Sequence, residues 1–215
     1  MELVENQYTI QGISVQDIAK EFGTPVYVYD AQSIKSQYNI LFNAFKGVDL
    51  KLKYAAKALT NKNIVKYIKS LGGGFDAVCI NEVKLALELG YDPQDIIYTP
   101  NCVHFDEVEE GISLGVHVNI DNLPYLEKIG QKYGSEQPVC VRINPHISAG
   151  GNKNIQVGHV GSKFGISILQ FDELLEIVNK YKINVNGLHV HTGSDILDVD
   201  VFLRGAEIIF ERAVH

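Results

Sequence analysis

Residues 50–78 read LKLKYAAKALTNKNIVKYIKSLGGGFDAV and contain one complete unit of a repeating pattern. An apolar, strand-like run (50–56) is followed by a segment with apolar residues at helical spacing, and then by a second strand-like run (74–78). Gly72 stands where a helix would end in a left-handed cap. The stretch therefore predicts a strand, a helix and a second strand.

The same unit repeats along the chain. Further strands are expected at 95–99, 116–120, 139–143 and 185–191, and helices at 63–71, 81–89, 106–114, 123–133 and 172–181. Three more helices end at a glycine, namely Gly90, Gly115 and Gly134. Alternation of this kind implies a parallel sheet, in a closed barrel or a doubly wound arrangement. Because no G-x-G-x-x-G motif opens the first helix, we expect an α/β fold of the (β/α)8 TIM-barrel type.

The predicted barrel is incomplete. Eight units take about 250 residues, whereas this chain supplies six strands and stops within a sixth helix with an apolar face formed by Phe202, Leu203, Ala206, Ile209 and Phe210. We therefore expect the N-terminal part of a longer enzyme, with residues 50–215 forming a partial barrel and residues 1–49 leading into it. In the leading segment, TPVYVYD (24–30) predicts a strand and SIKSQYNILFNAF (33–45) a helix.

Composition restricts the class of partner. The chain has 215 residues, 46% hydrophobic and 21% charged, as expected of a globular domain with a sizeable core. A formal net charge of -7 without a long Lys/Arg run argues against nucleic acid or an anionic membrane surface. No leader pattern or membrane-spanning run is present. We expect a cytoplasmic protein that binds a small molecule.

The three cysteines, Cys79, Cys102 and Cys140, are widely spaced and form no CxxC pair. Cys79 and Cys140 belong to strand-like apolar runs, so we interpret them as reduced core residues rather than as a disulfide or a metal site.

One predicted connection is unusually long. Residues 144–165 separate the fifth strand from the next helix, where two to six residues are usual in such loops. The segment follows the carboxyl end of a strand, the side on which barrel enzymes build their sites. It is either part of a site or a surface loop.

Lys57 ends the first predicted strand. Strand alternation places it on one face with Lys53 and Ala55. If that face lines the barrel, burial at the rim would desolvate the amine and make it a nucleophile that can form a Schiff base. The alternative is a lysine that extends from the rim into water.

The stretch HVHTGS (189–194) also ends a predicted strand. His189 and His191 share a face, a spacing that suits metal binding or the presentation of an imidazole to a bound ring. Gly193 and Ser194 follow in a turn, where backbone N–H groups and a hydroxyl can bind a phosphate. The alternative is a pair of core histidines bonded to the backbone.

Three further polar residues are candidates for the site. Asp76 lies on the second predicted strand, Glu82 opens the next helix, and Arg142 lies inside the fifth strand. A buried Asp and a buried Arg on neighbouring strands would be tolerated together, so a structural ion pair is the alternative to a role in the site.

Together these motifs resemble a known family. The order of FGTPVYVYD, YAAKALTN, GGGFDAVCINE, RINPHISAGGNKNIQVGHVGSKFGI and GLHVHTGSDI resembles the N-terminal half of the alanine-racemase-like, fold type III pyridoxal-phosphate decarboxylases. TPVYVYD, RINP followed by SKFG, and HTGSDI resemble the diaminopimelate decarboxylase branch more than the ornithine and arginine branches. One departure is Cys79-Ile80-Asn81-Glu82, where the family usually has Ser-Gly-Gly-Glu.

The resemblance implies pyridoxal phosphate as the cofactor. By analogy, Lys57 holds it as a Schiff base, His191 stacks on its ring and Ser194 contacts its phosphate, with the backbone of Gly193 in the same turn as a further candidate. The remaining matches frame the site, namely Asp76, Glu82 and Arg142. Lys57 and His191 are thus the implied catalytic residues, and His189 has no implied role.

The resemblance also implies a reaction. The full enzyme would decarboxylate meso-diaminopimelate to L-lysine in lysine biosynthesis, as a homodimer with shared active sites. It would also have a C-terminal β-domain beyond this chain, so the chain alone is expected to be inactive.

Three other functions stay open. A related pyridoxal-phosphate decarboxylase could act on ornithine, arginine or carboxynorspermidine. A metal-dependent barrel hydrolase could bind zinc through His189 and His191, with Asp76 as another ligand or base. A cofactor-homeostasis protein of the same barrel type would bind pyridoxal phosphate without catalysis.

Overall fold

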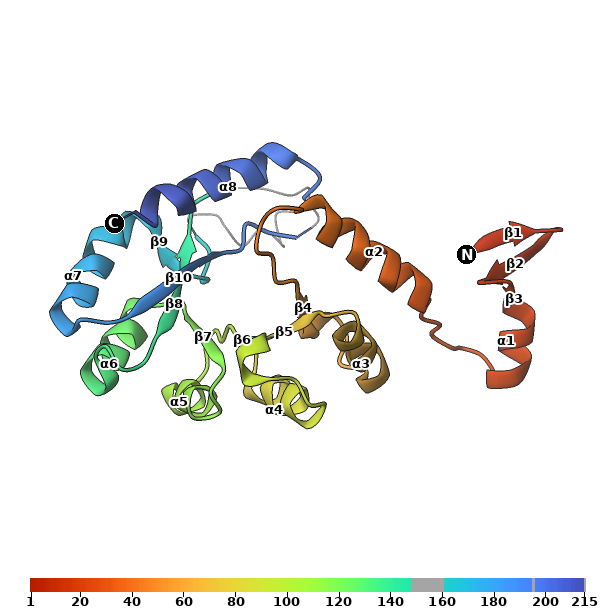
Figure 1. Ribbon diagram of the computed structural model, residues 1–215, viewed down its shortest axis with the longest axis horizontal. Coiled ribbons are helices and arrows are strands. Elements are labelled where there is room, and N and C mark those ends of the chain that lie inside the picture. The colour runs from red at the N-terminus through yellow and green to blue at the C-terminus, as the bar shows by residue number, and fades with distance from the viewer. Residues whose placement is uncertain (148–160, 195, 215) are drawn as a thin grey trace. The chain divides into compact units, whose positions relative to one another are not determined.

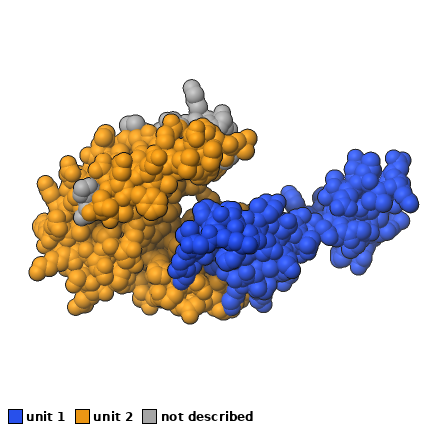
Figure 2. Space-filling view, turned by 45° about the horizontal axis from the view of Figure 1, so that its top comes forward, with its two compact units in different colours: residues 1–54, 59–74 blue, residues 55–58, 75–215 orange. Residues whose placement is uncertain are grey.

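The computed structural model of the chain describes residues 1–147, 161–194 and 196–214 (Figure 1). Two compact units are present (Figure 2): unit 1 comprises residues 1–54 and 59–74, and unit 2 comprises residues 55–58 and 75–215. The division into a leading segment (1–49) and a cofactor-binding barrel (50–215) stays a prediction.

Unit 1 begins with a three-stranded antiparallel sheet that the sequence patterns did not predict. Its strands are β1 (Glu2–Val4), β2 (Gln7–Ile10) and β3 (Ile13–Ser14). Glu5-Asn6 and Gln11-Gly12 connect them, and all four residues have positive φ values between 47° and 78°. Two-residue turns with left-handed residues match the twist of antiparallel strands, so these hairpins form from local chain geometry.

Three helices complete unit 1: α1 (Val15–Phe22), α2 (Ala31–Ala44) and α3 (Lys62–Ser70). Asp30 caps α2, because its Oδ1 accepts hydrogen bonds from the Gln32 and Ser33 N–H groups at 2.9 and 3.2 Å. This cap starts the helix two residues before its predicted start.

The predicted strand at 24–30 is wrong. These residues belong to no helix or strand, and Tyr27 is 89% exposed. Val26, Tyr27, Val28 and Tyr29 have high strand propensity, but within the described ranges they belong to no sheet. Pro25 in addition lacks the N–H that a sheet ladder requires. Propensity alone therefore does not produce a strand here.

In the main sheet, the paired strands from β5 to β10 run parallel to one another. The order of this sheet is β10-β8-β7-β6-β5-β4, with β9 paired to β8. The strands are β4 (Lys53–Ala55), β5 (Gly74–Ala77), β6 (Ile96–Tyr98), β7 (His117–Ile120), β8 (Val139–Asn144), β9 (Ile166–Ser167) and β10 (Val185–Val190). Apart from the short β9, each strand pairs with its neighbour in the chain, without the reversal of order that defines a doubly wound sheet. The order is that of a barrel, which stays incomplete in this chain.

Four helices of unit 2 cover one side of these strands (Figure 1): α4 (Ile80–Glu88), α5 (Phe105–Ser113), α6 (Leu123–Tyr133) and α7 (Phe171–Tyr181). With α3, they begin and end within one residue of the predicted bounds. Gly72, Gly90, Gly115 and Gly134 have φ values of 93°, 79°, 76° and 56°, so the predicted glycine ends are confirmed.

The core of unit 2 lies between these helices and the sheet. Tyr98 of β6 and Val118 of β7 are almost completely buried. A Cβ at Gly111 of α5 would stand 2.7 Å from the Tyr98 ring. Helix α5 can therefore approach the sheet this closely only because Gly111 has no side chain.

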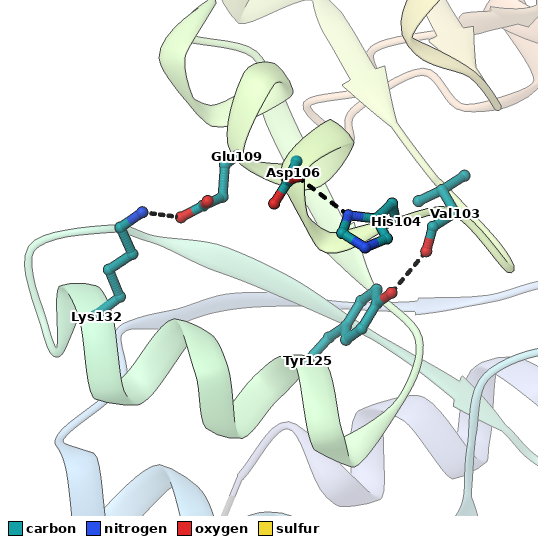
Figure 3. Close-up of polar contacts among 6 residues, drawn as sticks. All are labelled: Val103, His104, Asp106, Glu109, Tyr125 and Lys132. Carbon is teal, nitrogen blue, oxygen red and sulfur yellow. Dashed lines mark hydrogen bonds and ion pairs between the residues drawn. The ribbon is translucent and has the colours of Figure 1, made fainter.

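Polar contacts join α6 to α5 and to the loop that precedes α5 (Figure 3). The Tyr125 hydroxyl donates a 2.6 Å hydrogen bond to the Val103 carbonyl, and Lys132 forms an ion pair with Glu109. At the start of α5, His104 Nδ1 lies 3.2 Å from Asp106 Oδ2. The Tyr125 hydrogen bond thus fixes the loop that follows β6 to α6, and the Lys132–Glu109 pair joins α6 to α5.

The predicted sixth helix is confirmed as α8 (Val199–Arg212). Its buried residues are Val201 and Gly205, whereas Phe202, Leu203 and Phe210 of its predicted apolar face are 53%, 54% and 73% exposed. None of the helices in the described ranges has both the length and the apolar composition needed to cross a bilayer. Cys79, Cys102 and Cys140 are free thiols, and Cys79 and Cys140 are half-buried rather than the core residues that were predicted.

Candidate active site

A cavity of about 640 Å³ lies at the carboxyl ends of the strands of unit 2. Its volume is in the range that small-molecule sites occupy, roughly 300 to 1,000 Å³. Six of the predicted candidates line it, namely Lys57, Asp76, Arg142, His189, His191 and Ser194. The fold thus brings together residues that are up to 137 positions apart in the sequence.

Lys57 reaches the cavity from a different local structure than predicted. Strand β4 ends at Ala55, and Lys57 lies in the following short 3-10 turn, η1 (Ala56–Ala58). Strand alternation therefore does not extend to Lys57, and its side chain is exposed rather than desolvated. The amine is accessible from the cavity, in agreement with the alternative of a lysine that reaches water.

Asp76 projects from β5 into the same cavity. Thr99 Oγ1 donates a 3.2 Å hydrogen bond to Asp76 Oδ1. Burial raises the pKa of Asp76, and the Thr99 hydrogen bond is the strongest opposing influence. The positive charges of Lys57 and Arg142 also lower this pKa, whereas the negative charge of Glu82 raises it.

Arg142 is 7% exposed on β8. Burial lowers its pKa, and the negative charges of Asp121 and Asp76 act in the opposite direction. The expectation that Asp76 and Arg142 occupy neighbouring strands is wrong, because β6 and β7 separate β5 from β8. No ion pair of described residues joins them, and the Arg142 guanidinium lies 4.8 Å from the centre of the Phe164 ring. Arg142 is therefore a buried cation of the cavity wall.

His189 and His191 both face the cavity, as predicted. His189 is in register with Arg142 on the paired strand β8. Burial, and then the charges of Arg142 and His191, lower the pKa of His189 to about 4. Burial, Arg142 and Lys57 lower the pKa of His191 as well. Both imidazoles are therefore neutral at pH 7.

His189 also has an unsatisfied ring nitrogen. Its Nδ1 is buried and has no hydrogen-bond partner among the residues that the structure describes. A buried polar atom without a partner is costly unless a ligand or water satisfies it. Within the described residues, the Nδ1 of His189 is thus not bonded to the backbone, and a role of His189 in a ligand site stays a prediction.

Glu82 and Gly193 do not line the cavity in the described part of the chain. Glu82 Oε2 accepts a 2.8 Å hydrogen bond from the Val78 N–H and so closes the turn between β5 and α4. This contact holds the turn despite the unusual Cys79-Ile80-Asn81 sequence. Gly193 has a φ of 148° and directly precedes Ser194, which is exposed at the cavity. The predicted cofactor contacts of both residues stay predictions.

Several cavity residues were not predicted: Val78, Thr99, Asn101, Lys163 and Phe164. Thr99 closes the predicted strand 95–99, so its place at a strand end could have indicated it. Lys163 and Phe164 belong to the SKFG stretch that ends the long connection 144–165. Most of that connection (148–160) lies outside the described residues.

Comparison with known proteins assigns the family. Residues 31–214 match the pyridoxal binding domain of a family described as "Pyridoxal-dependent decarboxylase". This chain belongs to the pyridoxal-dependent decarboxylases. The match includes every predicted site residue and supports neither the zinc hydrolase nor the homeostasis alternative.

Similar pyridoxal-dependent decarboxylases include curated diaminopimelate decarboxylases. That of Methanothermobacter thermautotrophicus is 32% identical, over 95% of this chain and 48% of the relative. That of Staphylococcus aureus (strain COL) is 33% identical, over 94% of this chain and 50% of the relative. The chain thus spans about half the length of the curated relatives it matches.

Solved structures give the same result. The M. jannaschii diaminopimelate decarboxylase in co-complex with L-lysine superposes with a TM-score of 0.85 at 27% identity, over 98% of this chain and 51% of that one. The Helicobacter pylori enzyme complexed with L-lysine has a TM-score of 0.78 at 28% identity, over 92% and 53%. The barrel-type fold of this decarboxylase family is therefore confirmed for the chain.

The cavity fits pyridoxal phosphate chemically. It offers a primary amine for an aldehyde (Lys57), a neutral imidazole for a ring (His191), and a hydroxyl and a buried cation for anionic groups (Ser194, Arg142). In contrast, the described residues contain no group of three or more His, Cys, Asp or Glu side chains that could hold a metal ion.

Proposed function

We propose that the full-length protein decarboxylates meso-diaminopimelate to L-lysine, with pyridoxal phosphate attached to Lys57. The observation that carries this proposal is the meeting of Lys57, His191 and Ser194 in one cavity of a pyridoxal-dependent decarboxylase chain. The choice of substrate is supported by the curated relatives, which are diaminopimelate decarboxylases.

Different residues of the chain would bind different parts of the cofactor. Pyridoxal phosphate, when bound, supplies a sink for the electron pair left behind as carbon dioxide departs. Lys57 would hold the aldehyde through its accessible amine. Ser194 and the backbone of Gly193 would bind the phosphate, and the neutral imidazole of His191 would contact the ring without adding a charge.

The charges of the cavity favour anionic ligands. Arg142 is a buried cation and Lys57 an accessible one, and both line the cavity. A phosphate or a substrate carboxylate would be attracted more strongly here than in water, because the buried wall screens the charges less. Asp76 balances part of this positive charge close to Lys57, and Glu82 would support it by holding the turn after β5.

The first experiment is to trap the cofactor. The full-length protein is incubated with pyridoxal phosphate, reduced with borohydride and digested, and the labelled peptide is identified by mass spectrometry. We expect a pyridoxyl adduct on Lys57, its loss in Lys57→Ala, and its retention in the control Lys51→Ala, which changes an exposed lysine outside the cavity. An adduct on Lys163 instead of Lys57 would contradict the assignment.

The second experiment identifies the substrate. Release of carbon dioxide from meso-diaminopimelate, ornithine, arginine and carboxynorspermidine is compared at equal concentrations. We expect turnover of meso-diaminopimelate to L-lysine, and preferential turnover of another substrate would identify a related decarboxylase.

We also propose that the enzyme is a cytoplasmic homodimer with shared active sites. Analytical ultracentrifugation measures the oligomeric state. A monomer that retains full decarboxylase activity would refute the shared active sites.

A further inference from the structure

Three polar side chains form a line of hydrogen bonds across neighbouring strands, and two of them, Asp76 and Thr99, face the cavity. Asn119 on β7 donates a 2.9 Å hydrogen bond through Nδ2 to Thr99 Oγ1. Thr99, directly after β6, donates a 3.2 Å hydrogen bond to Asp76 Oδ1 on β5. Asn119 and Thr99 are only 3% and 7% exposed, so water does not compete strongly for these groups.

The line has a defined direction. An amide N–H can only donate, and an ionised carboxylate can only accept. Thr99 has a single hydroxyl proton and accepts from Asn119, so that proton is directed to Asp76. The line therefore ends in a donor that suits the ionised form of Asp76.

This donor opposes the effect of burial. Burial raises the pKa of Asp76, and the Thr99 hydrogen bond is the largest influence that lowers it. The charged groups acting on Asp76 are Lys57 from η1, Glu82 from α4 and Arg142 from β8. Lys57 is exposed and its charge is partly screened by water, whereas the Thr99 hydrogen bond is shielded.

We propose that Thr99 is a positioning residue that favours the carboxylate form of Asp76 and fixes this carboxylate at the cavity, and that Asn119 holds the Thr99 hydroxyl in place. The importance of this arrangement for decarboxylation rests on the proposed function. The arrangement itself is a property of the chain without cofactor.

The test measures the titration of Asp76 directly. Carbon-13 NMR of the carboxyl group follows Asp76 with pH in the cofactor-free protein, and Asp76→Asn assigns the signal. Thr99→Val removes the hydroxyl and keeps the shape, whereas Thr99→Ser keeps the hydroxyl. Thr9→Val is the matched control, because the buried Thr9 hydroxyl has no hydrogen-bond partner in the described part of the chain.

We expect the Asp76 midpoint to shift upward in Thr99→Val and to stay at the wild-type value in Thr99→Ser and Thr9→Val. If Thr99→Val does not fold, Thr99→Ala against Thr99→Ser makes the same comparison. An unchanged midpoint without the hydroxyl would overturn the proposal.

A second readout connects the line to activity. In the cofactor-loaded full-length enzyme, we expect the acid limb of the pH profile of kcat to shift to higher pH in Thr99→Val. In Thr99→Ser, the acid limb should stay at the wild-type pH. An unmoved limb would refute the role in decarboxylation. Absence of a Lys57 adduct would refute the proposed function and leave the titration result intact, so the two failures are distinguishable.

Discussion

Gly165 lies against the backbone of Asn144 on β8, so closely that a Cβ on Gly165 would stand 2.9 Å from the Asn144 amide nitrogen. Its φ is +78°, a conformation that side-chain-bearing residues rarely adopt. The two residues just before it, Lys163 and Phe164, line the cavity. The contact between Gly165 and Asn144 therefore determines where the long connection returns to the site.

Replacement of this glycine should be unusually costly. Gly12 has the same φ of +78° but no atom within 4 Å of an added Cβ, so it is a matched control. We expect Gly12→Ala to lower the free energy of unfolding by about 1 to 2 kcal/mol through backbone strain alone. Gly165→Ala adds a clash with the β8 backbone and should cost roughly 3 kcal/mol or more. Urea denaturation measures the free energy of unfolding of both variants. Equal losses in the two would show that the β8 backbone moves to accommodate the added methyl group without further cost.

Ser194 should contribute directly to cofactor affinity. Its hydroxyl is exposed at the cavity, and a hydrogen bond to a charged phosphate contributes about 1.5 kcal/mol or more. We expect Ser194→Ala in the full-length protein to raise the dissociation constant for pyridoxal phosphate about tenfold. Equilibrium dialysis measures this change, and the exposed Ser135→Ala is the control. Equal affinities of both variants would remove Ser194 from the phosphate site.

His189 should make the protein sensitive to acid. Its pKa is lowered from 6.5 to about 4, so below pH 6.5 the unfolded chain takes up a proton that the folded chain does not. Stability should therefore fall as the pH is lowered from 6.5 to about 4, by on the order of 3 kcal/mol from this residue. Stability stays level, with respect to His189, above pH 6.5.

Chemical denaturation across this pH range tests the assignment. His189→Gln should flatten the acid loss, because glutamine does not titrate. His104→Gln is the control, because the His104 side chain is 80% exposed beside Asp106 (Figure 3). If both variants keep the full wild-type loss, the acid sensitivity comes from other groups.

The Tyr125 hydroxyl should stabilise unit 2. It donates a 2.6 Å hydrogen bond to the Val103 carbonyl in the loop between β6 and α5 (Figure 3). Tyr125→Phe leaves the ring in place and removes the donor, so we expect a loss of about 1 kcal/mol in the free energy of unfolding. Tyr27→Phe should change little, because Tyr27 is 89% exposed. Thermal and urea denaturation compare the two, and equal effects would contradict the role of this hydrogen bond.

The cavity shows how far local patterns reach. Lys57, His191 and Ser194 were predicted because they follow apolar runs, and residues at the carboxyl ends of parallel strands meet at one edge of the sheet. Thr99 and Phe164 were missed as site residues. Thr99 contributes through a hydrogen bond to a residue 23 positions away, and Phe164 through a ring contact with Arg142.

The sequence by itself determined the βα units, their glycine ends and the set of polar residues at the strand ends. These features depend on helical and strand periodicity and on the backbone freedom of glycine, which act over a few residues. Only the tertiary structure decided that residues 24–30 form no strand, that Lys57 lies in a turn, and that β6 and β7 separate Asp76 from Arg142. The physical reason is that strand pairing, burial and hydrogen bonding between distant residues depend on what the fold brings together, and neighbouring residues do not specify those partners.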